Sequence, residues 1–192
     1  MNLSKGDKVD LVKEAGGSLS KVMIACGWDV RRGEGPAYDL DASILGVGVD
    51  NKALGQDWFV YYGHKNSPQN IIVHHGDNLT GAGDGDDEQI TINLDGLPAE
   101  VQKLVIAVTI YEAAKRGGQT FSQVENAYVR VIDSSNNTEL TKYDLSENTA
   151  SGVNCVMFGE LYRHDGGWKF KAVGDGFMNE LGGFLQSYGL SV

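Results

Sequence analysis

Short segments that alternate apolar and polar residues recur along this chain. In residues 21–26, for example, Val22, Ile24 and Cys26 fall on one side of an extended backbone while their neighbours fall on the other. A period of two is typical of β-strands that bury one face. The same alternation occurs in residues 8–13 and 88–94. These segments are predicted to be half-buried strands.

A second kind of segment is apolar or β-branched almost throughout. Such runs suit central strands that are covered on both faces. They occupy residues 57–62, 103–111, 127–132, 155–162 and 168–173. With 26 glycines in the chain to form tight turns, this pattern predicts an all-β fold: a β-sandwich of two mainly antiparallel sheets, formed by residues 1–192 as a single domain.

Helical periodicity is limited to two places. Residues 97–104 have Pro98 at a suitable first position, with Val101 and Leu104 at helical spacing, so we expect a short helix there. Near the C-terminus, Phe177, Leu181, Phe184, Leu185 and Tyr188 form one apolar stripe. This second helix is expected to close one end of the core.

The net charge narrows the class of partner. The chain has 16 basic and 26 acidic residues, which gives a formal charge of −10. This negative charge argues against nucleic acid or a bare anionic membrane as a partner and favours cations. No apolar run approaches the roughly 18 residues of a membrane helix, and we expect a cytoplasmic protein. Cys26 and Cys155 are expected to be small core residues without a disulfide.

One loop concentrates negative charge within a glycine-rich backbone. Residues 74–94 read HHGDNLTGAGDGDDEQITINL, which contains no Lys or Arg. A phosphate cradle needs a helix N-terminus and usually a Lys, so the sign of this loop argues against one. Calcium takes six to eight oxygen ligands, and glycines let backbone carbonyls turn toward an ion. The loop offers oxygens from Asp77, Asn78, Thr80, Asp84, Asp86, Asp87 and Glu88.

Other acids support a cation site, although a solvated acidic loop would have the same composition. In residues 38–43 the alternation places Asp39 and Asp41 on one face of a strand, and Asp29 follows Trp28 at another strand end. The spacing is not that of an EF-hand, because Gln89 stands where its glycine is required. The adjacent His74 and His75 point to opposite faces of a strand, which disfavours a zinc site.

Taken together, these segments resemble the TerD family of tellurium-resistance and general stress proteins. The segments that carry the resemblance are LSKG (3–6), GWD (27–29), YDLDAS (38–43), HHGDNLTGAGDGDDE (74–88), TIYEA (109–113), YDLSE (143–147), FGELYR (158–163) and WKFKAVG (168–174). The resemblance implies a β-sandwich in a cytoplasmic bacterial protein that binds about two Ca²⁺ ions. Its implied ligands are Asp77, Asn78, Thr80, Gly83, Asp86 and Glu88 of the loop, with Asp29, Asp39 and Asp41 from strand ends; Asp84 ranks lower.

The leading functional hypothesis is therefore a non-catalytic, calcium-binding stress protein. Its loop would become ordered around the ions and present a surface to protein partners of a stress-resistance complex. One alternative is a module that binds a membrane or a nucleotide through calcium, with peripheral association at the inner membrane face. Another is a metal-dependent phosphohydrolase, for which His74 or His75 would have to be the base.

Overall fold

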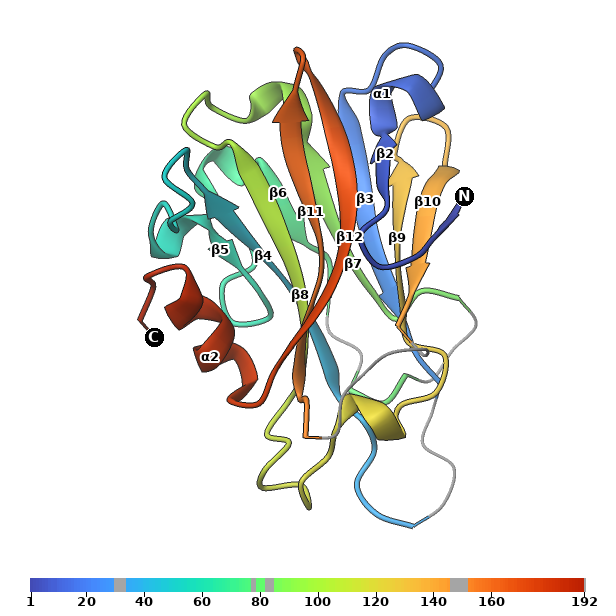
Figure 1. Cartoon of the computed structure of the whole chain (residues 1–192), viewed down its shortest axis with the longest axis vertical. Coiled ribbons are helices and arrows are strands. Elements are labelled where there is room, and N and C mark those ends of the chain that lie inside the picture. Colours follow the sequence, from blue (N-terminus) through green and yellow to red (C-terminus); the bar gives the residue numbers. More distant parts are fainter. Residues whose placement is uncertain (30–33, 77–78, 82–84, 146–151, 192) are drawn as a thin grey trace.

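The protein is a sandwich of two β-sheets, as expected from the sequence (Figure 1). The computed structural model describes residues 1–29, 34–76, 79–81, 85–145 and 152–191. The first sheet has six strands, in the order β1 (Asn2–Leu3), β10 (Thr138–Asp144), β9 (Tyr128–Asp133), β3 (Lys21–Gly27), β7 (Glu88–Asn93) and β6 (Ile72–His74). The second also has six, in the order β2 (Lys8–Asp10), β12 (Gly167–Phe177), β11 (Cys155–His164), β8 (Lys103–Ile110), β4 (Leu40–Val47) and β5 (Phe59–Val60).

Neighbouring strands pair in an antiparallel manner, apart from β1, which runs parallel to β10. Two α-helices, α1 (Leu11–Glu14) and α2 (Glu180–Ser187), and short 3₁₀ turns complete the described secondary structure. The turns are η1 (Gln56–Trp58), η2 (Pro68–Asn70), η3 (Leu94–Gly96) and η4 (Phe121–Gln123). Among the described residues, no helix is long and apolar enough to cross a bilayer.

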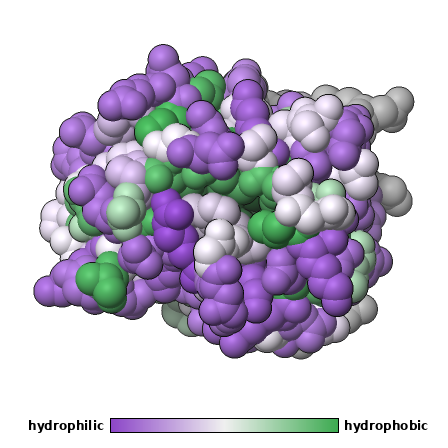
Figure 2. Space-filling model, turned by 90° about the horizontal axis from the view of Figure 1, so that it is seen from above, coloured by the Kyte–Doolittle hydropathy of each residue, from purple (hydrophilic) through white to green (hydrophobic). Residues whose placement is uncertain are grey.

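The main core lies between the inner faces of the two sheets. Ile24 from β3 and Ile90 from β7 are almost fully buried there, and Ile44 from β4 and Ile106 from β8 belong to the same cluster. Each fully buried side chain of this size contributes roughly 1.5–3 kcal/mol to folding. At one end of the sandwich, polar residues cover most of the surface and apolar ones show only in small patches (Figure 2).

A second apolar cluster lies on the outer face of the second sheet, beneath α2 (Figure 1). Phe184 and Leu185 of the helix are fully buried against Val105 and Met157 of the strands. Strand β4 is therefore buried on both faces along its whole length. This explains why the central strands are continuously apolar, and it confirms the predicted C-terminal helix.

The helix predicted for residues 97–104 is wrong. Residues 97–102 are irregular and β8 begins at Lys103. The guanidinium of Arg163 donates hydrogen bonds to the carbonyls of Leu97 (2.9 Å), Pro98 (3.3 Å) and Val101 (3.0 Å). A helix would need the first of these carbonyls for its own backbone bonds, so a tertiary contact replaces the local preference.

The strand predicted for residues 8–13 is correct only as far as Asp10. The Asp10 carboxylate accepts a hydrogen bond from the Lys13 amide at 3.1 Å and caps α1, which begins at Leu11. Cys26 and Cys155 are buried and free, as the sequence predicts, and the structure places them in different sheets. Burial raises the pKa of both thiols, so neither is activated as a nucleophile.

Candidate functional site

Those predicted acidic ligands that the structure describes gather at one end of the sandwich, where β3 ends and β4, β7 and β9 begin (lower end in Figure 1). Asp29 lies just beyond β3, Asp39 and Asp41 lie at the start of β4, and Asp86 and Asp87 immediately precede β7. Thr80 lies in the acidic loop, where it is exposed. Asp77, Asn78, Gly83 and Asp84 lie outside the described residues.

Trp28 connects the acids of the two sheets. Its backbone amide donates to Asp87 Oδ2 at 2.9 Å, and its indole Nε1 donates to the Tyr38 carbonyl, next to Asp39, at 3.2 Å. Gly81 of the acidic loop packs on the same indole: a Cβ at this position would lie 2.5 Å from Nε1, and its φ of +68° also favours glycine. A buried tryptophan therefore fixes the spacing between the acidic loop and the start of β4.

Asp29 and Asp87 form the part of the site that faces solvent more openly. Asn126 donates to Asp29 Oδ2 at 2.8 Å, and the Asp29 amide donates to the Glu125 carbonyl at 3.0 Å, so the end of β3 is held in place. Partial burial raises the pKa of Asp87, and the charges of Asp86 and Asp29 raise it further, whereas the Trp28 amide opposes this shift. The negative charge at this position is therefore only partly compensated by the protein.

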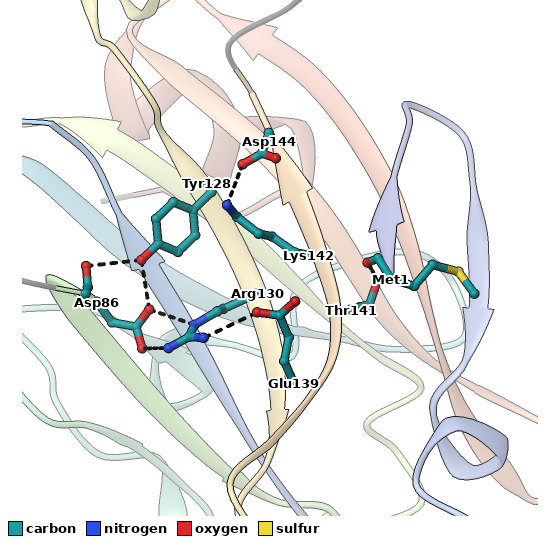
Figure 3. Close-up of polar contacts among 9 residues, drawn as sticks. Met1, Asp86, Tyr128, Arg130, Glu139, Thr141, Lys142 and Asp144 are labelled. Atoms are coloured by element: carbon teal, nitrogen blue, oxygen red, sulfur yellow. Dashed lines mark hydrogen bonds and ion pairs between the residues drawn. The ribbon is translucent and has the colours of Figure 1, made fainter.

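Asp86 is engaged by two residues of β9 (Figure 3). Arg130 donates from Nε to Oδ1 at 2.8 Å and from a terminal nitrogen to Oδ2 at 2.7 Å, and the Tyr128 hydroxyl lies 3.0 Å from Oδ1. This two-pronged pair raises the pKa of Arg130. Because both carboxylate oxygens bind Arg130, Asp86 ties the acidic loop to the first sheet.

Glu88 turns into the interior of the sandwich. Its Oε2 accepts a hydrogen bond from the Ala42 amide of β4 at 2.6 Å and lies 3.7 Å from His74 Nε2. Both side chains have an exposed fraction of 0%. Glu88 thus connects β7 of the first sheet to the edge of β4 in the second, where β5 has not yet begun.

The two adjacent histidines face opposite ways, as the strand periodicity predicts. His74 Nδ1 accepts from the Gly76 amide at 3.3 Å, and its Nε2 faces Glu88 Oε2 at 3.7 Å. His75 is exposed and its Nε2 lies 2.8 Å from Thr91 Oγ1. The complete burial of His74 keeps it away from any substrate in solution, so it is not placed to act as the base that a phosphohydrolase would need.

Asp39 and Asp41 both line a cavity of about 290 Å³, which confirms that they share a face of the chain. The cavity is completed by Tyr62, Leu79, Tyr111 and Arg116. Arg116 forms an ion pair with Asp39 at 3.0 Å and stacks over the ring of Tyr111. Within the described parts of the chain, no three His, Cys, Asp or Glu side chains converge as metal ligands. Asp29, Asp39, Asp41, Thr80, Asp87 and Glu88 each take part in additional interactions.

Comparison with known proteins identifies the family. The family model described as the TerD domain matches residues 1–188. The chain belongs to the TerD family. It is 43% identical over 191 residues to a protein of Serratia marcescens named tellurium resistance protein TerD, covering 100% of this chain and 98% of the relative. It is 42% identical over 193 residues to general stress protein 16U of Bacillus subtilis, again covering 100% and 98%.

Solved TerD-like structures support the same fold. A crystal structure of a homologue of telluride resistance protein (TerD) from Streptomyces coelicolor superposes with a TM-score of 0.73 at 24% identity, covering 91% of this chain and 100% of that one. A second crystal structure, of a protein of unknown function, has a TM-score of 0.73 at 26% identity and covers 87% and 95%. The TerD sandwich inferred from the sequence is thereby confirmed.

Sequence reasoning did not find the partners of Asp86 in the TerD acidic loop or of Asp39 at the start of β4. Arg130 and Tyr128 lie in β9, and Arg116 lies after β8, all far along the chain from the carboxylates that they bind. One signal was available: Arg130 interrupts the apolar run of 127–132, and a charged residue inside a buried strand usually has an ionic partner.

Proposed function

We propose that this protein is a non-catalytic, calcium-binding stress-response protein of bacteria, acting in resistance to tellurite and oxidative stress. The relatives named for tellurium resistance and general stress support the biological part. The observation that carries the calcium part is the junction at Trp28, which touches both Asp87 and the residue before Asp39. Trp28 therefore links Asp87, next to β7 of the first sheet, to the residue that precedes Asp39 at the start of β4 in the second sheet.

The chemistry of the donors fits a hard cation. Asp29, Asp39, Asp41 and Asp87, with Thr80, would supply oxygens from described residues; Asp77, Asn78, Gly83 and Asp84 would supply the rest. Asp86 and Glu88 have oxygens bound to Arg130 and Ala42, so we assign them to anchoring the loop. Partial burial raises the pKa of Asp87 most, and the charges of Asp86 and Asp29 add to it; bound calcium would favour the ionised carboxylate and offset both effects.

A calcium titration of the metal-stripped protein tests the proposal. An ion that binds only the folded state stabilises it by about 4 kcal/mol at a thousandfold excess over its dissociation constant. For a chain of this size, that corresponds to a rise in Tm of roughly 8–16 °C. Mg²⁺ at the same concentration should raise Tm less, because it requires a tighter octahedral site.

Matched variants identify the ligands. The double variant Asp39→Asn/Asp41→Asn should lose most of the calcium-induced rise in Tm. Asp165→Asn, in the exposed turn between β11 and β12, removes one carboxylate elsewhere and should keep the full rise. An unchanged Tm of the wild type in excess calcium refutes calcium binding, and an equal rise in all three proteins refutes the assignment to β4.

A further inference from the structure

Next to the acids of β4 lies a small pocket with aromatic walls. It is lined by Asp41 and Ser43 of β4, Thr109 of β8, Tyr61 and Tyr62 after β5, Tyr111 and Glu112 after β8, and Glu180 and Leu181 of α2. Its volume is about 110 Å³. At about 30 Å³ per water molecule, it has room for only three or four waters, and thus for a head group but not a nucleotide.

The aromatic rings form walls at right angles. The ring of Tyr62 lies 5.1 Å from that of Tyr61 at an angle of 86°, and 5.6 Å from that of Tyr111 at 89°. Phe59 stacks behind Tyr61 at 4.6 Å and supports that wall. Aromatic faces carry negative electrostatic potential, so walls of this kind attract a cation while shielding it from water.

Carboxylates complete the negative lining. Asp41, Glu112 and Glu180 line the pocket, and its described lining contains no Lys or Arg. Glu180 accepts from the Ala114 amide at 3.3 Å and Glu112 pairs with Lys115 at 2.6 Å, so both carboxylates are held near the rings. Thr109 contributes a hydroxyl from a side chain that is almost fully buried, with the weakly polar Cys155 thiol beside it.

The chain already binds a guanidinium in this way beside the pocket. Arg116 lies 5.2 Å from the centre of the Tyr111 ring while a terminal nitrogen pairs with Asp39 at 3.0 Å. The pocket repeats this combination of tyrosine ring and aspartate with Tyr61, Tyr62 and Asp41. Guanidinium also suits carboxylates better than an alkylated ammonium, because its planar donors form paired hydrogen bonds.

We propose that the pocket of Tyr61, Tyr62 and Tyr111 binds a guanidinium head group, either a small free cation or the end of an arginine side chain. This site takes an organic cation through rings and carboxylates and does not rest on the calcium proposal. Asp41 belongs to both sites, so calcium and guanidinium are expected to weaken each other's binding reciprocally.

The test uses methylguanidinium as the probe and the full-length protein in EDTA, so that failure of calcium binding does not affect the outcome. Tyrosine fluorescence or side-chain NMR shifts should report saturable binding, with a dissociation constant on the order of millimolar. Tetramethylammonium should bind at least several-fold more weakly. Tyr62→Ala should weaken methylguanidinium binding tenfold or more, whereas Tyr62→Phe should stay within about twofold.

A matched control and a peptide complete the design. Tyr162→Ala removes a tyrosine from β11, away from the pocket, and should leave affinity unchanged. Tyr62 is already 36% exposed in the wild type, and an unaltered circular dichroism spectrum of Tyr62→Ala will show that the variant remains folded. Tighter binding of an arginine-containing peptide than of methylguanidinium assigns the site to a protein ligand, and equal binding assigns it to a free cation. Equal affinity of wild type and Tyr62→Ala, or equal binding of tetramethylammonium, overturns the proposal.

Discussion

Replacing Glu88 by alanine tests whether this residue joins the two sheets. The change removes the acceptor of the Ala42 amide, a bond of 2.6 Å inside the sandwich, and leaves that N–H buried. An unsatisfied buried donor costs about 1–3 kcal/mol, and the cavity left by the side chain adds to this. We therefore expect a loss of roughly 2–4 kcal/mol in the free energy of unfolding, or a fall in Tm of about 4–16 °C.

Glu88→Gln separates the hydrogen bond from the charge. Its amide oxygen can still accept from Ala42, so the expected loss is only about 1 kcal/mol, the difference between charged and neutral acceptors. Urea unfolding in EDTA measures both variants without interference from calcium, and His75→Ala, on the exposed face of the same segment, should change stability by less than about 0.5 kcal/mol. Equal losses for the alanine and glutamine variants would refute the hydrogen-bonded link between the sheets.

Two other substitutions test the electrostatics of the acidic end. The folded-state pKa of Asp87 is raised above its ordinary value of 3.8, so its charge destabilises the metal-free protein as pH rises past that value. Asp87→Asn can still accept a hydrogen bond from Trp28, so it should be more stable than wild type at pH 7 in EDTA, and this advantage should vanish near pH 3. Urea unfolding from pH 3 to pH 7 measures the difference in stability between the two proteins. A difference that stays constant over this range contradicts the predicted effect of the Asp87 charge. Arg130→Met leaves the Asp86 carboxylate without its paired donors and should destabilise by about 2–3 kcal/mol. In a double-mutant cycle with Asp86→Asn, the second change should recover part of the loss, and strictly additive effects would count against the pair.

The sequence predicted the features that depend on local periodicity. The alternation around Asp39 and Asp41 correctly placed both on one face, and the opposite orientations of His74 and His75 followed from the same rule. The continuous apolar runs predicted the central strands because α2 and the inner core cover both of their faces. Local pattern is informative wherever the backbone is a regular strand.

The failures share one cause, a contact between residues that are distant in sequence. Arg163 binds the Leu97 carbonyl that a helix over residues 97–104 would have used, and no property of those residues reveals this contact. In the same way, the composition of the acidic loop does not indicate that Asp86, Asp87 and Glu88 have different roles. Their roles differ because each acid accepts hydrogen bonds from a different residue: Asp86 from Arg130, Asp87 from Trp28 and Glu88 from Ala42.

The pairing of β3 with β7 also joins residues that are far apart along the chain. Cys26 of β3 pairs with Glu88 of β7. This pairing closes the segment between the two strands into one loop, and the predicted cation ligands from Asp29 to Asp87 all lie within that segment. Closing a long loop has an entropic cost, and proteins dominated by such non-local strand pairings typically fold in milliseconds to seconds. Arg130 arrives only afterwards in synthesis, with β9. During synthesis, the acids of the site therefore precede the residue that restrains Asp86 in the folded protein.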